Sequence, residues 1–120
     1  MGAAPHSLKG SAAFLLKDPP KWPAVSDCSM TCTSKVPDGV KGFYYWYYGT
    51  LAMFQIGGDE WKQWNETLKN VLVPNQSKAG PEDGSWDPRD VSDWAGGRAY
   101  TTALGALCLE VYYRYLPLYR

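Results

Sequence analysis

The chain has 120 residues, the usual size of one domain. Its 12 basic and 12 acidic residues cancel, so overall charge draws it neither to nucleic acid nor to an anionic membrane surface. No apolar run reaches the roughly 18 residues that a bilayer-spanning helix needs, and no segment has the pattern of a secretory signal peptide. We therefore expect a cytoplasmic protein that recognises its partners by shape and apolar contact.

The first region, residues 1–42, is predicted to form a short helix followed by a loop-like arm. Apolar residues recur at helical spacing over 7–17, and Pro19-Pro20 ends that pattern. Prolines and glycines then recur as far as Gly42, which indicates a loop.

The three cysteines are an odd number, which fits a reducing compartment. Together with Cys108 and the single His6, Cys28 and Cys32 could supply four zinc ligands. Their spacing matches known zinc sites poorly, so we predict no metal. The role of the Cys28–Cys32 loop stays open.

A second helix is predicted over 42–56, and it ends at Gly57-Gly58. The segment 43–58 contains no charged residue and is rich in Tyr and Trp. A helix that is apolar on every side must be buried. We therefore expect an inner helix that is enclosed by its neighbours.

A third helix is predicted over 59–73, with Asp59 as its N-cap and Pro74 after its end. One face is apolar and the opposite face carries charged and amide side chains, so this helix should be half buried. The apolar face consists of Trp61, Trp64, Leu68, Val71 and Leu72.

The Gly- and Asp-rich residues 75–97 are predicted to form a second long loop, and a last, apolar helix is predicted over 97–116. Glu110 and Arg114 are spaced to form an ion pair on this helix. The apolar stripe of this last helix consists of Tyr100, Leu104, Leu107, Val111 and Tyr115, and its small residues that admit a close neighbour are Ala99, Ala103, Gly105 and Ala106. No strand is predicted.

Three blocks of the second region, 43–120, resemble a known family. The blocks are Tyr44-Tyr45-Trp46-Tyr47-Tyr48-Gly49-Thr50, Gly84-Ser85-Trp86-Asp87-Pro88 and Gly96-Gly97-Arg98-Ala99-Tyr100-Thr101-Thr102-Ala103-Leu104, and Gln76 with Gly84 and Trp86 forms a Gln…Gly-x-Trp repeat. These blocks and this repeat resemble those of the bacterial prenyltransferase/squalene-oxidase-repeat proteins, within the squalene cyclase and protein prenyltransferase superfamily.

The resemblance implies an all-α fold of the α/α-toroid type, in which inner helices line a cavity and outer helices face water. In this family the Gln caps a helix end and the Trp packs against the neighbouring hairpin, so Gln76, Gly84 and Trp86 are expected to be structural. About four helices make only a partial toroid. The chain is then either a piece of a longer protein or a unit that self-associates.

The catalytic groups of the family's enzymes are missing. Squalene cyclases use a DxDD acid, and Asp90-Val91-Ser92-Asp93 has only the outer two carboxylates. Protein prenyltransferases use Asp, Cys and His to hold zinc, and the single His6 lies outside the matched blocks. We predict no catalytic residue and no cofactor, and whether the chain is an enzyme stays uncertain.

Two functions are therefore carried forward. The first is a non-catalytic helical module that binds a protein partner or a second copy through its apolar inner helices. The alternative is a protein that binds an isoprenoid or another long apolar ligand, or a cyclase-like enzyme with Asp87 or Asp93 as the acid. The expected cavity-lining residues are Tyr44, Tyr45, Trp46, Tyr48, Arg98, Tyr100 and Tyr112.

Two charged features have competing interpretations. Arg98 begins the last helix and could face a diphosphate, but pairing with Asp90 or Asp93 is favoured. The acidic residues of the second loop could bind calcium, although no EF-hand spacing is present and a solvated loop is favoured. These acidic residues are Glu82, Asp83, Asp87, Asp90 and Asp93.

Overall fold

The computed structural model describes residues 6–22 and 41–114 of the chain. All regular secondary structure in this part is helical and it contains no strand, so the all-α prediction is confirmed. Residues Cys28 and Cys32 and the C-terminal end of the chain from residue 115 lie outside the described residues. The elements are α1 (His6–Leu16), α2 (Phe43–Ile56), α3 (Gly58–Asn75), the 3₁₀ turn η2 (Gly80–Glu82), α4 (Val91–Leu109) and the single turn α5 (Val111–Arg114).

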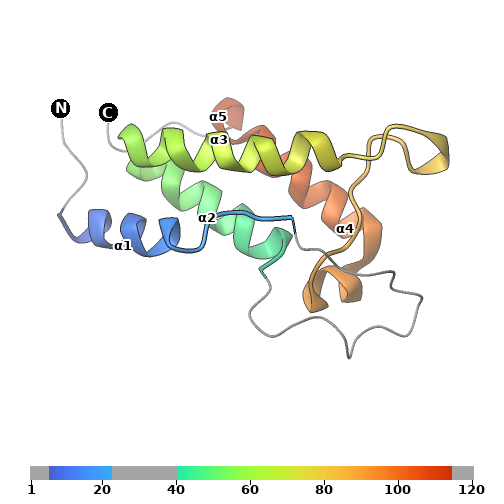
Figure 1. Ribbon diagram of the computed structural model, residues 1–120, viewed down its shortest axis with the longest axis horizontal. Helices are drawn as coiled ribbons and strands as arrows, with labels where there is room; N and C mark the ends of the chain where they lie inside the picture. The colour runs from blue at the N-terminus through green and yellow to red at the C-terminus, as the bar shows by residue number, and fades with distance from the viewer. Residues whose placement is uncertain (1–5, 23–40, 115–120) are drawn as a thin grey trace.

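The α2 helix is the centre of the arrangement. It packs against α1, α3, α4 and α5, while α1 also contacts α3 (Figure 1). Within the described residues, no helix combines the length and apolar character that crossing a bilayer requires.

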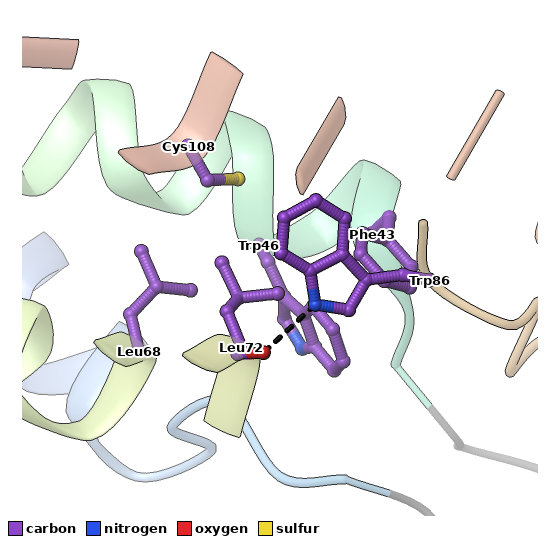
Figure 2. Close-up of a cluster of buried hydrophobic side chains, with 6 residues drawn as sticks. All are labelled: Phe43, Trp46, Leu68, Leu72, Trp86 and Cys108. Atoms are coloured by element: carbon purple, nitrogen blue, oxygen red, sulfur yellow. Dashed lines mark hydrogen bonds between the residues drawn. The ribbon is translucent and has the colours of Figure 1, made fainter. Parts of the chain in front are cut away.

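Two clusters of buried side chains hold these helices together. The apolar face predicted for the third helix is observed, because Trp64, Leu68 and Leu72 of α3 are fully buried at a spacing of four residues. One cluster joins α1, α2 and α3 through Ala12, Met53 and Trp64. The other joins α2, α3, the following loop and α4 through Phe43, Trp46, Leu68, Leu72, Trp86 and Cys108 (Figure 2).

A buried hydrogen-bond chain links α2 to α3. The indole nitrogen of Trp64 donates to the hydroxyl of Thr50 at 2.9 Å, and that hydroxyl donates to the backbone carbonyl of Trp46 at 2.6 Å. Thr50 is therefore both acceptor and donor, and the buried Trp64 nitrogen is satisfied.

The expectation that α2 is enclosed on every side is wrong for the chain by itself. The face that contains Phe43, Trp46 and Met53 is buried, but Tyr44 and Tyr48 are 56% and 53% exposed, and Ala52 is also exposed. Ala99, Ala103 and Ala106 of α4 are exposed as well. The four helices that contact α2 cover only part of the apolar surface that it presents.

The last helix also differs from its prediction over 97–116. It begins at Val91, because Asp90 acts as its N-cap, and it ends at Leu109 before the short α5. Its path breaks at Gly97, whose φ of 78° and ψ of −175° are not helical. Few residues other than glycine adopt such a positive φ, so Gly97 permits the break.

The apolar stripe of the last helix is rotated from the predicted one. Thr101, Gly105 and Cys108 are buried, whereas Tyr100, Leu104 and Leu107 of the predicted stripe are only half buried. The physical reason is Trp86: a Cβ atom on Gly105 would lie 2.8 Å from its Cε3 atom, so only glycine admits this close approach. Val111, the first residue of α5, is fully buried as predicted. The predicted pair of Glu110 and Arg114 does form, with Arg114 Nη1 3.6 Å from Glu110 Oε1.

Candidate binding groove

A groove of about 480 Å³ runs along the exposed face of α2. Three of the expected cavity-lining residues, Tyr44, Tyr45 and Tyr48, lie in its wall. This volume falls within the range of about 300–1,000 Å³ that is typical of small-molecule sites. Gly49 and Ala52 continue the wall along the helix, and Leu15 of α1, Lys41, Asp90 and Ser92 complete it.

The two ends of the groove differ in polarity. Lys41 immediately precedes α2, and Gly42 brings the start of that helix against the carboxyl group of Asp90. The polar side chains of Lys41, Asp90 and Ser92 therefore gather at one end. Leu15 and Ala52 are the aliphatic residues of the lining: Ala52 is the lining residue of α2 farthest from Lys41, and Leu15 packs beside the cluster that contains Met53.

Tyrosine rings occupy the middle of the groove. The ring centroids of Tyr44 and Tyr48 are 4.8 Å apart. Tyr45 packs edge-on against Trp64 and donates its hydroxyl to the backbone carbonyl of Asp18 at 2.9 Å. Burial, and then the nearby charge of Asp18, raise the pKa of Tyr45 above its ordinary value, so this hydroxyl stays a neutral donor.

The Lys41 ammonium lies 5.6 Å from the centroid of the Tyr45 ring. At this distance the electron-rich face of the ring attracts the cation. Lys41 is itself exposed, so it remains accessible at the rim of the groove.

The carboxylates of Asp90 and Asp93 form a capping box at the start of α4. Asp90 Oδ1 accepts from the N–H of Asp93 at 2.7 Å, and Asp93 Oδ2 accepts from the N–H groups of Asp90 and Arg89 at 3.2 and 3.0 Å. Phe43 at the start of α2 also donates a backbone hydrogen bond to Asp93. These two residues therefore hold the beginnings of α2 and α4 together.

Asp93 is fully buried, and one of its oxygens, Oδ1, has no hydrogen-bond partner within the described residues. Burial, and then repulsion from Asp90, raise the pKa of Asp93 to about 6. The three backbone donors oppose that rise but do not cancel it. Asp93 is not among the residues that line the groove, so it is not placed to protonate a ligand there.

The residues of the predicted repeat motif tie the loop after α3 to the helices. The buried indole nitrogen of Trp86 donates to the carbonyl of Leu72 at 2.8 Å (Figure 2). Thr101 donates its hydroxyl to the carbonyl of Trp86 at 2.6 Å, and the N–H of Trp86 donates to the hydroxyl of Thr102 at 3.3 Å. Trp86 is thus fixed to α3 through its side chain and to α4 through its backbone.

Gln76 has a different partner from the one that the resemblance implies. Its amide nitrogen donates to the carbonyl of Gly84 at 2.8 Å, and not to the end of a helix. Two backbone bonds between Ser77 and the segment Gly84-Ser85, both 2.8 Å long, close the same loop. Gln76 therefore secures the base of the loop, while Trp86 satisfies a carbonyl in the last turn of α3.

The expected pairing of Arg98 with Asp90 or Asp93 is wrong, because those carboxylates cap α4. Arg98 instead forms ion pairs with Asp87 and with Glu82, the latter at 3.3 Å, and donates to the hydroxyl of Ser85 at 2.8 Å. Its guanidinium therefore anchors the loop, outside the groove, and is not free to receive a diphosphate.

Asp87 is also fully engaged. It pairs with Arg98 and accepts from Arg89 at 3.3 Å. Arg89 in turn stacks on Trp22, with its guanidinium carbon 4.4 Å from the ring centroid. Asp87 is thus held between two arginines and is not among the residues that line the groove.

The remaining expected lining residues lie elsewhere. Trp46 is fully buried in the core, and the side chain of Tyr112 lies outside the described residues. Tyr100 is half buried and is not among the residues that line the groove. Burial, and then the charges of Asp93 and Asp90, raise the pKa of Tyr100.

No cluster of three or more His, Cys, Asp or Glu side chains that could hold a metal occurs in the described part of the chain. Of the predicted acidic loop, Glu82 and Asp87 face Arg98, and Asp90 and Asp93 cap α4. Cys108 is buried as a free thiol, and burial raises its pKa to about 12. The side chain of His6 lies outside the described residues, so the zinc alternative is untested.

No protein-family model, curated protein or solved structure matches the chain. The resemblance to toroid proteins therefore stays a prediction from the sequence motifs. The groove residues that the sequence did not indicate are Leu15, Lys41, Gly49, Ala52, Asp90 and Ser92.

Proposed function

We propose that the chain is a non-catalytic helical-repeat module of the α/α-toroid type that binds a protein partner or a second copy of itself through α2 and α4. The observation that carries this proposal is the open face of α2. A helix without a single charged residue leaves Tyr44 and Tyr48 more than half exposed. Uncovered apolar surface of this kind marks interaction sites in folded proteins.

The shape of this face supports a helical partner. Tyr44, Tyr48 and Ala52 recur every four residues along α2, and α2 packs directly against α4. On α4, Ala99 and Ala103 form a neighbouring strip of small exposed residues. Large rings beside small residues offer both ridges and grooves to an incoming helix. Tyrosine is also enriched in protein interfaces, because its ring is apolar and its hydroxyl remains wet.

The engagement of the acidic side chains supports a non-catalytic role. Asp87 is paired with two arginines, and Asp93 is sequestered in the capping box. A general acid must lie within hydrogen-bond reach of its substrate. Neither carboxylate lines the groove. A cytoplasmic location is part of the same proposal.

Sedimentation velocity over a range of about 1–100 µM tests the proposal, since that range covers weak to moderate association. We expect the sedimentation coefficient of the wild type to rise with concentration. Tyr48→Lys places a charge on the open face and should give a monomer. Asn70→Lys, on the exposed face of α3, is the matched control and should associate as the wild type does.

A wild type that is folded and monomeric throughout that range argues against self-association. The partner form of the proposal is then tested by binding to other chains, with Tyr48→Lys again as the defective variant. Loss of association in Asn70→Lys as well would place the interface outside the α2–α4 face and overturn the proposal.

The groove favours a second candidate, a protein that binds an isoprenoid or another long apolar ligand. Its volume and its tyrosine wall suit such a ligand. Thermal shift with squalene or a prenyl diphosphate, read beside mass spectrometry for turnover, tests it. No stabilisation by either compound would remove this candidate.

A further inference from the structure

We infer that the groove along α2 binds a single-chain amphiphile, with its alkyl tail at the Leu15–Ala52 end and a zwitterionic head at the Lys41–Asp90 end. This inference rests on the second candidate function above and names the class of ligand. Three properties of the groove lead to it: its length, the order of its lining along α2, and the two opposite charges at one end.

The groove is elongated along α2, because most of its lining residues belong to that helix, while Leu15 of α1 and the residues at the start of α4 complete its walls. Tyr44 and Ala52 are eight residues apart on α2, and a helix rises about 1.5 Å per residue, so the helical part of the lining extends over about 12 Å, and Lys41 lies beyond its start. An extended chain with a head group fits this dimension better than a compact ring system does.

The lining changes from apolar to polar along that length. Leu15 and Ala52 offer only aliphatic carbon to an occupant. The Tyr48 and Tyr44 rings follow, and an alkyl chain packs well against their faces. Lys41 and Asp90 come last. Such an order matches a molecule with an apolar tail and a polar head.

The head must carry both signs of charge, because the polar end does. Lys41 offers an ammonium group, and Asp90 offers a carboxylate of which Oδ1 is used in the capping box. Among the described residues, no ion pair joins Lys41 to Asp90. A purely anionic head would meet Asp90, and a purely cationic head would meet Lys41. A head with both charges satisfies both residues, and the Ser92 hydroxyl adds a further hydrogen-bonding group.

Isothermal titration calorimetry with four decyl-chain probes, each below its micelle concentration, tests the inference. The probes are decylphosphocholine, decanoate, decyltrimethylammonium and decyl maltoside, so only the head varies. We expect decylphosphocholine to bind most tightly, about twofold to fivefold better than either singly charged probe, as a rim charge of this kind would give.

Two variants locate the tail and the head. Ala52→Trp fills the apolar end and should weaken every probe by roughly tenfold or more. Lys41→Met removes the ammonium and should abolish the preference for decylphosphocholine over decyltrimethylammonium. Ala79→Trp, at an exposed position before η2, is the matched control and should leave binding unchanged.

The outcomes separate this inference from the function on which it rests. Binding of squalene without binding of decylphosphocholine overturns the amphiphile but leaves the apolar-ligand function standing. Equal affinity for all four heads overturns the zwitterionic head. Unchanged binding in Ala52→Trp places the ligand elsewhere and overturns the site. If neither squalene, a prenyl diphosphate nor any decyl probe binds, the ligand function and the inference both fail.

Discussion

The indole nitrogen of Trp86 donates a hydrogen bond to the backbone carbonyl of Leu72, 2.8 Å away. Leu72 lies in the last turn of α3, where carbonyl groups have no partner within the helix. The same indole ring packs between Phe43 and Trp46 of α2, Leu68 and Leu72 of α3, and Cys108 of α4. Trp86, a loop residue, thus packs against three helices and provides a hydrogen-bond donor for a carbonyl group in the last turn of α3.

Trp86→Phe should destabilise the fold by about 1–3 kcal/mol, because it removes the bond to Leu72 and leaves that carbonyl buried without a donor. Urea denaturation followed by circular dichroism measures the free energy of unfolding. Trp61→Phe, at a half-buried position of α3, is the control and should cost clearly less. Equal losses in the two variants would contradict the role assigned to Trp86.

Gly105→Ala and Gly10→Ala should have opposite effects. A Cβ atom on Gly105 would meet the Trp86 ring at 2.8 Å, whereas a Cβ atom on Gly10 in α1 meets nothing within 4 Å. Crowding should destabilise the first variant by about 1–3 kcal/mol. Helix propensity should stabilise the second by about 0.5–1 kcal/mol. Thermal melts of both variants suffice, and stabilisation by Gly105→Ala would refute the close packing of α4 on Trp86.

Thr50→Val should destabilise the protein by about 1–3 kcal/mol, because the Trp64 nitrogen loses its acceptor while it stays buried. Thr67→Val is matched to it, since the hydroxyl of Thr67 also donates to a carbonyl four residues earlier but is exposed. That variant should change stability little. The comparison of their urea midpoints checks this, and a similar loss in both would show that the Thr50–Trp64 bond contributes nothing of its own.

Asp93→Asn should change how stability depends on pH. The pKa of Asp93 is about 6 in the folded protein against an ordinary value of 3.8, so the folded state holds a proton that the unfolded state releases. The contribution of Asp93 is complete below pH 3.8 and is lost as pH rises to about 6. The wild type should therefore lose on the order of 2 kcal/mol relative to Asp93→Asn across this interval.

Urea unfolding of both proteins at half-unit steps from pH 4 to pH 8 measures that difference. Asp59→Asn, whose side chain is exposed, controls for the loss of one carboxylate elsewhere and should follow the wild type. Parallel curves for the wild type and Asp93→Asn would show that the carboxyl group titrates normally.

The sequence predicts α2 and α3 to within two residues, because local signals set both. The apolar run of α2 stops at Gly57, and the four-residue spacing of Trp64, Leu68 and Leu72 fixes the buried face of α3. The beginning of α4 was missed although its signal is also local. Asp90 and Asp93 have the spacing of a capping box, but the Gly- and Asp-rich composition of residues 75–97 favours a loop throughout that segment.

Of the residues that line the groove, the sequence predicts only the tyrosines. Tyr44 and Tyr48 are conspicuous in the sequence, but Leu15 and Asp90 come from elements that tertiary packing brings to α2. The partner of Arg98 was missed for the same reason. Asp87 reaches it through the fold of the loop, whereas the carboxylates nearer in sequence are occupied by the backbone of α4.

The loop between α3 and α4 is sealed at its base by the Ser77–Ser85 and Ser77–Gly84 bonds, while its tip at residues 79–81, before the ion-paired Glu82, faces solvent. Foreign sequence inserted at that tip, such as an epitope tag or a fluorescent label, would leave the anchored tryptophan and both flanking helices in register. The molecule thus offers a natural attachment point on which a reporter can be mounted without disturbing the tyrosine wall.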